Sequence, residues 1–238
     1  MHNSDREWEA WGAKDPYYGV VSDEKFHASA IDKSREEFFR TGEDFIQMIL
    51  AEAIAAYGPL ARKSALDFGC GVGRLTMALA QQFDFVTGVD VSHSMLKIAG
   101  QNCRGRFLSS LDDVSEEFDF VISYIVLQHI PVDRGYVIID KLLKRLRNTG
   151  VAMLHVSIKR NYSPVTASAY WLKHNIPVVR PILNLVRGKP LSASVMQMNE
   201  YDLGQVLSIF EKNNMSDIKL IREVHHKVDT VRILGRKL

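Results

Sequence analysis

The sequence predicts an α/β fold with a parallel sheet and a ligand-binding turn behind its first strand. Residues 64–68 are a short apolar run typical of a buried strand, and residues 74–80 have the composition of a following helix. Between them stand Gly69, Gly71 and Gly73, and glycine lets the backbone turn sharply and a ligand approach without a Cβ in the way. A strand, a glycine turn and a helix N-terminus together form a nucleotide-binding corner.

The spacing of the glycines distinguishes two kinds of cofactor loop. The dinucleotide fingerprint is G-x-G-x-x-G, whereas here the third glycine comes one residue early and Asp67 precedes the first. The pattern D-x-G-x-G-x-G resembles the cofactor loop of the class I S-adenosylmethionine-dependent methyltransferases. The resemblance implies that Asp67, Gly69, Cys70, Gly71 and Gly73 belong to the cofactor site.

The next apolar run ends in Asp90, 17 residues past Gly73, close to the roughly 20 expected for such a unit. A carboxylate at the end of the second strand can accept both hydroxyls of a ribose. Ser92 is a plausible N-cap for the helix that follows. The string G-V-D-V-S-x-x-M-L is similar to the second element of the family and adds Val91 and Met95 to the predicted cofactor site.

A third element departs from the family pattern. The family usually places an acid and a small residue against the adenine, where this chain has Ser109, Ser110 and Leu111. The resemblance implies that Ser110 and Leu111 take that place, with a weaker hydrogen bond from serine to the exocyclic amine. Asp112 is the alternative partner if the loop shifts.

A fourth element begins at Asp119, directly before an apolar run typical of a strand buried on both faces. The family pattern F-D-x-V-x-S implies that Tyr124 lies at the cofactor and that His129 lies at the mouth of the site. His129 is the candidate general base, because imidazole titrates in the useful range; the alternative is a structural histidine. Tyr18 and Gln128 are candidate contacts to the methyl acceptor.

The matches follow one another in order over residues 64–156. The resemblance implies a Rossmann-like, seven-stranded, mostly parallel sheet with an antiparallel edge strand and helices on both faces. We expect one domain over residues 1–238, made of an N-terminal helical extension (1–60), a cofactor-binding core (61–158), a helical cap inserted between strands five and six (159–200), and a C-terminal helix and strand pair (201–238). Within the extension, periodicity predicts helices over about 34–39 and 43–57.

The N-terminal aromatic residues from Trp8 to Tyr18 allow two interpretations. They close over the methionine end of the cofactor, or they anchor the segment to the core. Arg35 or Arg40 could bind the cofactor carboxylate as a fork, although an ordinary surface charge explains either one.

The charge is unevenly distributed. Residues 1–140 carry 13 basic and 22 acidic side chains, residues 141–238 carry 17 and 6, and no acid stands between Asp140 and Glu200. This basic stretch is either a solvated face or a surface that attracts an anionic or amphiphilic acceptor or a membrane surface. Trp171 and Arg180 in the expected cap are candidate acceptor contacts.

Composition limits the alternatives. The chain has no apolar run long enough to span a membrane and no leader pattern, and two cysteines make no disulfide framework, so we expect a cytoplasmic protein. No metal is expected, because His225 and His226 point to opposite faces of a strand. The expected function is methyl transfer from S-adenosylmethionine to an oxygen or nitrogen of an acceptor, with a small molecule favoured and nucleic acid disfavoured. A nicotinamide-dependent oxidoreductase and a non-catalytic cofactor-binding or RNA-binding module are the rival interpretations.

Overall fold

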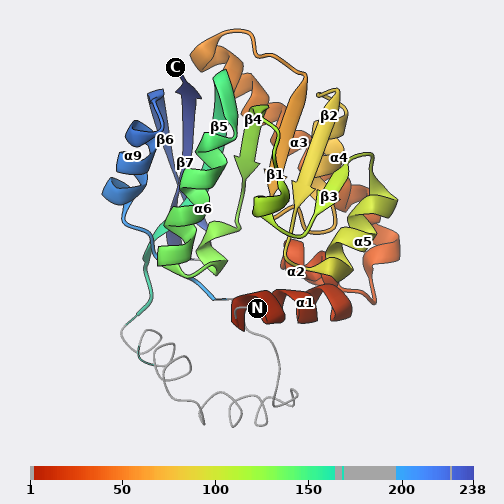
Figure 1. The fold of residues 1–238 in the computed structure, drawn as a ribbon. Helices are drawn as coiled ribbons and strands as arrows, with labels where there is room; N and C mark the ends of the chain where they lie inside the picture. The colour runs from red at the N-terminus through yellow and green to blue at the C-terminus, as the bar shows by residue number, and fades with distance from the viewer. Residues whose placement is uncertain (1–2, 164–167, 169–196, 226) are drawn as a thin grey trace.

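The protein is built on a seven-stranded mixed sheet (Figure 1), seen in a computed structural model that describes residues 3–163, 168, 197–225 and 227–238. The strand order is β3-β2-β1-β4-β5-β7-β6. Strands β1 to β5 run parallel, and β7 runs antiparallel to both of its neighbours. The strands are β1 (Ser64–Phe68), β2 (Phe85–Val89), β3 (Arg106–Leu108), β4 (Phe118–Ser123), β5 (Leu146–Arg160), β6 (Met215–His225) and β7 (Val228–Lys237). The predicted mostly parallel sheet with an antiparallel edge is confirmed.

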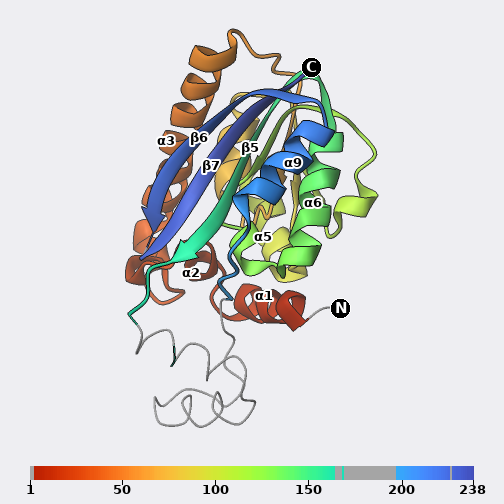
Figure 2. The ribbon, with the colours of Figure 1, turned by 90° about the vertical axis from the view of Figure 1, so that its left-hand side faces the viewer.

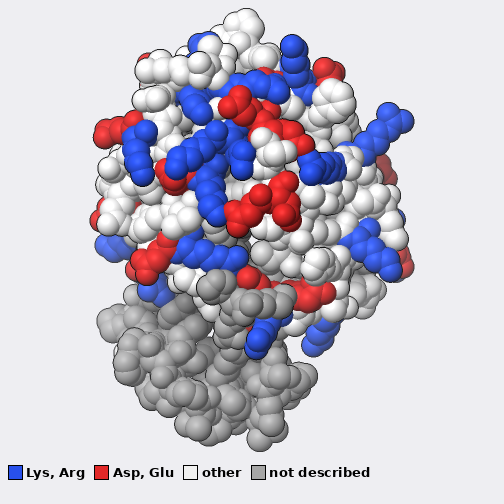
Figure 3. Space-filling model, viewed as in Figure 1, with Lys and Arg blue, Asp and Glu red and all other residues white. Residues whose placement is uncertain are grey.

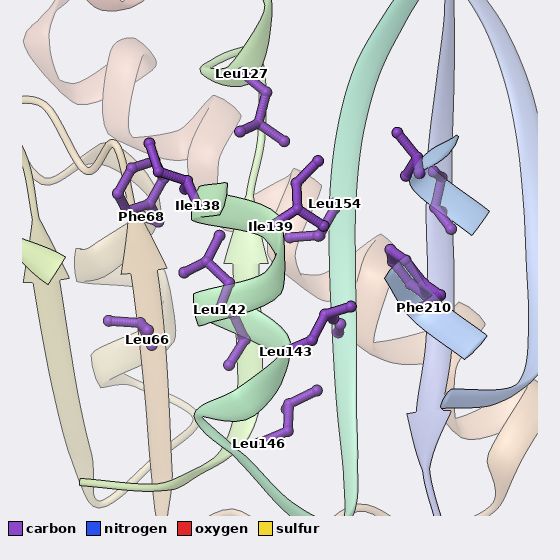
Figure 4. Packing of buried hydrophobic residues seen from close by; sticks show 14 of the residues in the cluster. Leu66, Phe68, Leu127, Ile138, Ile139, Leu142, Leu143, Leu146, Leu154 and Phe210 are labelled. Atoms are coloured by element: carbon purple, nitrogen blue, oxygen red, sulfur yellow. The ribbon is translucent and has the colours of Figure 1, made fainter. Parts of the chain in front are cut away.

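Helices cover both faces of the sheet. Figure 2 shows α3 on one face and α6 and α9 on the other. Because side chains alternate along a strand, Leu66 and Leu154 pack under α6 and α9, whereas Ala65 and Met153 pack under α3 and α4. Figure 4 shows the leucines and isoleucines of α6 in contact with the first of these faces. The helices that follow the strands are α4 (Arg74–Ala80), α5 (His93–Asn102), α6 (Val132–Lys144) and α9 (Leu203–Lys212).

The N-terminal extension is helical, as predicted, but its long helix is continuous. It comprises α1 (Asn3–Lys14), α2 (Pro16–Val20), a 3₁₀ turn (Glu24–Phe26) and α3 (Ile31–Tyr57). The prediction of two helices with a break near Gly42 was wrong. A Cβ at Gly42 would lie 2.5 Å from the backbone oxygen of Arg74, so this glycine serves close packing of α3 on α4 rather than a turn. Gly58, with φ of 79°, ends α3 where the sequence placed the stop.

Most of the predicted cap, including Trp171 and Arg180, lies outside the described residues. Within the described part of the chain, no helix is both long and apolar enough to cross a membrane. Figure 3 shows acidic and basic side chains interleaved over the face seen in Figure 1.

Candidate cofactor and acceptor site

A cavity of about 670 Å³ opens at the carboxyl ends of the parallel strands. Ligands of open α/β sheets bind at this end of the sheet, and the volume is in the usual range for a small-molecule site. Its wall comes from the glycine turn, the ends of β2 and β4, the segment after β3 and the N-terminal extension. Of the predicted residues, it is lined by Asp67, Gly69, Cys70, Gly71, Asp90, Val91, Met95, Ser110, Leu111, Tyr124, Gln128 and His129.

The turn requires glycine for two reasons: its backbone has positive φ angles, and neighbouring side chains leave no room for a Cβ. Gly69, Gly71 and Gly73 have φ values of 78°, 53° and 88°, which disfavour a side chain. A Cβ on Gly69 would lie 2.2 Å from Val126 Cγ2. Gly73 is not part of the cavity wall and instead precedes α4 as its N-cap. The turn therefore presents bare backbone to the cavity.

Asp67, at the end of β1, holds the glycine turn in place through a contact with α4. It is buried, and its Oδ2 accepts a hydrogen bond of 2.7 Å from Thr76 Oγ1 on α4. Burial raises the pKa of Asp67 to about 6, and the bond from Thr76 partly counteracts that rise. The carboxyl group thus ties the end of β1 to the helix behind the turn.

Asp90 joins the turn to the end of β2. Its Oδ2 accepts from the Gly71 amide and its Oδ1 from the Ser92 amide, both at 2.9 Å. Burial raises the pKa of Asp90, and these two backbone bonds lower it. A carboxylate has about four acceptor positions, so two remain for a ligand. The predicted N-cap is confirmed as well, because Ser92 Oγ accepts from the Met95 amide.

The segment after β3 forms the far wall. Ser110 Oγ accepts from the Asp112 amide, so this serine caps a 3₁₀ turn and keeps its own proton for donation. Asp112 pairs with Lys141 Nζ at 2.5 Å. The adenine contact of Ser110 and Leu111 stays a prediction, and both residues line the cavity.

The N-terminal extension closes the cavity from the other side. Gly19 and Val20 line it, and a Cβ on Gly71 would lie 2.5 Å from Val20 Cγ2. Trp8 lines it too, with its ring 5.0 Å from that of His129. Tyr18 does not line it, because its ring stacks on His27 at 3.8 Å. Its predicted contact with the acceptor stays a prediction.

Comparison with known proteins agrees with this geometry. Residues 65–150 match the family model described as a methyltransferase domain. The ubiquinone biosynthesis O-methyltransferase of Methylococcus capsulatus is 35% identical over an 88-residue alignment, which covers 33% of this chain and 37% of that protein. Over this segment, which carries the glycine turn and Asp90, the chain is similar to methyltransferases. It spans little more than a third of the length of the curated relatives it matches.

Solved structures of methyltransferases share the fold. The magnesium protoporphyrin IX methyltransferase of Synechocystis PCC 6803, solved with bound SAH, superposes with a TM-score of 0.64 at 18% identity, over 99% of this chain and 100% of that one. The N-methyltransferase NodS of Bradyrhizobium japonicum, also with S-adenosyl-l-homocysteine, gives a TM-score of 0.58 at 14% identity over 99% of each chain.

His129 is held by a hydrogen bond at each of its ring nitrogens. Its Nδ1 donates to the Gln197 carbonyl at 2.6 Å, and its Nε2 accepts from Gln128 Nε2 at 3.1 Å. Burial lowers the pKa of His129 to about 4, so the ring is neutral near pH 7. To act as a base, His129 must release Gln128 and accept the proton on Nε2. Its catalytic role stays a prediction.

Tyr124 follows β4 at the cavity wall. Its ring lies 4.0 Å from that of Phe45 on α3 and 4.9 Å from that of His155, and burial raises its pKa to about 12. The next residue, Ile125, has φ of 59°, which is unusual for a β-branched side chain. Strained backbone of this kind clusters at functional sites.

Sequence reasoning missed the arginine of the site. Arg35 is exposed and donates to Asn102, and Arg40 is exposed, and neither lines the cavity. Arg74 does line it and is 8% exposed. Its Nη1 donates to Thr41 Oγ1, whereas among the described residues its Nε has no hydrogen-bond partner. The position of Arg74 directly after the third glycine could have indicated that it lies at the cofactor turn.

Proposed function

We propose that this protein transfers the methyl group of S-adenosylmethionine to an oxygen or nitrogen atom of a small-molecule acceptor. One observation carries the proposal: a single cavity brings together the bare glycine turn, the Asp90 carboxylate and the wall at Ser110 and Leu111. The family match to residues 65–150 supports it. When bound, the cofactor supplies a sulfonium methyl group with a good leaving group.

The residues present fit that cofactor. Gly69 and Gly71 line the cavity with backbone alone, and a Cβ on either would collide with Val126 or Val20. Asp90 keeps two acceptor positions for a ribose after bonding Gly71 and Ser92. Within the described residues Arg74 has no ion pair, so its buried guanidinium is suited to an anionic group such as the cofactor carboxylate.

The protein contributes alignment and exclusion of water more than acid–base chemistry. Trp8, Gly19 and Val20 cover one side of the cavity, and Tyr124 with Ile125 forms the side toward β4. A proton has to be removed only from an acceptor that arrives protonated. His129 is then the proposed base, because its neutral Nε2 can take a proton once Gln128 moves.

The acceptor is proposed to enter between Gln128, His129 and the β6–β7 end of the sheet, where Met198, His225 and Val228 line the cavity. Lys141 and Arg134 at its rim are already paired with Asp112 and Asp5. An anionic or amphiphilic acceptor therefore depends on basic residues of the 159–200 segment, among them Arg180. We also infer a reducing, cytoplasmic setting, supported by two free cysteines.

Calorimetry tests the cofactor proposal. The protein should bind S-adenosylmethionine and S-adenosylhomocysteine and should not bind NAD. Mass spectrometry of a copurified ligand gives an independent readout, and a screen of small-molecule, lipid-linked and RNA acceptors then follows methyl transfer. Tight NAD binding with neither methionine nucleoside would support the oxidoreductase interpretation instead.

A further inference from the structure

Three polar side chains lie together on the face of the sheet that α3 covers, where β5, β7 and β6 lie side by side. His155 is on β5, and Glu223 and His225 are two residues apart on β6, so the latter two share one face. Glu223 Oε2 lies 3.2 Å from His225 Nε2 and 4.0 Å from His155 Nε2. One ligand atom from each of the three residues falls within 4.8 Å of the others. Two imidazoles and a carboxylate thus converge from strands that are not neighbours.

His155 lacks the partner that a buried polar side chain needs. It is fully buried, and neither of its ring nitrogens has a hydrogen-bond partner within the part of the chain that is described. Leaving such an atom unpaired in the protein interior is destabilising. Burial lowers the pKa of His155 to about 3, so the ring is neutral, which is the form that binds a metal ion.

Arg232 orients the Glu223 carboxylate. Arg232 Nε donates to Glu223 Oε1 at 2.5 Å, and Arg232 Nη1 donates to Glu52 Oε2 at 2.6 Å. This leaves Glu223 Oε2 directed toward the imidazoles, and such outer partners are typical of metal-ligating carboxylates. Glu52, Glu223 and Arg232 together carry one net negative charge, so the group still favours a cation.

We propose that His155, Glu223 and His225 bind a divalent transition-metal ion of the zinc class. Two histidines and one carboxylate are a known ligand set for catalytic zinc and for non-haem iron, whereas Mg²⁺ prefers oxygen ligands alone. Ligand atoms at about 2.0–2.2 Å from a tetrahedral ion lie roughly 3.3–3.6 Å apart, so the side chains need to move by about 1 Å.

The proposed ion would lie at the wall of the cavity. His225 and Tyr124, whose ring lies 4.9 Å from that of His155, both line that cavity. An acceptor oxygen bound in the cavity could become a further ligand of the ion, a consequence that rests on the proposed methyl transfer, whereas metal binding itself does not.

Titration of the chelator-treated full chain with Co²⁺ tests the site, because histidine-bound Co²⁺ gives a visible absorption band. One equivalent should bind, and Zn²⁺ should displace it while excess Mg²⁺ should not. His225→Gln and His155→Gln should each weaken Co²⁺ binding by about 100-fold or more. His225 is partly exposed, so His225→Gln should keep the fold, checked by circular dichroism. His93→Gln is the matched control, because His93 is exposed at the start of α5.

Absence of stoichiometric Co²⁺ binding, or equal affinity in folded His225→Gln and wild type, overturns the proposal. Displacement by Mg²⁺ overturns the assignment to the zinc class. Calorimetry with S-adenosylhomocysteine on the same samples separates the two proposals. Cofactor binding without Co²⁺ binding removes only the metal site, and Co²⁺ binding without cofactor binding removes only the proposed function.

Discussion

Replacing Asp90 by alanine should weaken binding of S-adenosylhomocysteine by about one to two decades. The carboxylate has two free acceptor positions beyond its bonds to the Gly71 and Ser92 amides. Hydrogen bonds to a charged group contribute roughly 1.5–3 kcal/mol, and each 1.4 kcal/mol is about tenfold in the dissociation constant. The variant also leaves the Gly71 amide without its acceptor, so part of the loss reflects a less ordered turn.

Calorimetry on two further variants separates these contributions. Asp90→Asn keeps the shape and one acceptor oxygen but removes the charge, so it should lose at least tenfold in affinity. Asp113→Asn is the control, because Asp113 is exposed on the neighbouring 3₁₀ turn and does not line the cavity. It should stay within about threefold of wild type, a change below 1 kcal/mol. An unchanged dissociation constant in folded Asp90→Ala would refute the assignment of Asp90 to the ribose.

Three further predictions concern the base, the turn and acid stability. If His129 is the base, His129→Ala should lower turnover by roughly 10²–10⁴-fold with little change in cofactor affinity, and near-normal turnover would make it structural. Gly71→Ala should weaken cofactor binding at least tenfold by calorimetry, because its φ of 53° and its contact with Val20 both oppose a Cβ. The double variant Gly71→Ala with Val20→Ala should recover only part of the lost affinity. Full affinity in Gly71→Ala would contradict this account of the turn. The free energy of unfolding should fall as the pH is lowered from about 6.5 to 5. The folded pKa values of His129 and His155 lie below the unfolded value of 6.5, so their contribution to stability is present above pH 6.5 and is lost in acid. Asp67, with its pKa raised to about 6, and Asp90, whose pKa burial also raises, have the opposite sign and reduce the slope, so it stays below the roughly 2.7 kcal/mol per pH unit that two histidines alone would give. Urea denaturation that shows a flat or rising stability in this window would contradict it.

Local patterns predicted the sheet and the cofactor end of the cavity. The glycine turn, Asp90 and the Ser92 cap depend on residues close together in the sequence, where spacing alone determines geometry. The sequence predicts the C-terminal strand pair over 218–225 and 230–234. In the structure the first strand begins earlier, at Met215, and the second is longer at both ends, over Val228–Lys237. Strand ends depend on pairing with neighbours, which a single strand's composition does not specify.

Contacts between distant segments could not be predicted in this way. The periodicity predicts separate helices over 34–39 and 43–57, whereas one helix runs through Gly42, whose packing against the Arg74 backbone is visible only once α3 and α4 are placed. His155 and Glu223 come together because β7 lies between β5 and β6 in a particular register. The sequence analysis considered only the adjacent pair His225-His226. It did not use the spacing of two residues between Glu223 and His225, which places both side chains on one face of a strand.

The position of α1 gives the protein an internal optical reporter. Two of its three tryptophans, Trp8 and Trp11, are on this helix, and Trp8 borders the cavity beside His129. Any ligand that displaces the N-terminal wall must change the surroundings of these indoles. Intrinsic fluorescence can therefore report ligand binding at this wall without an attached dye, and Trp171→Phe removes the remaining emitter.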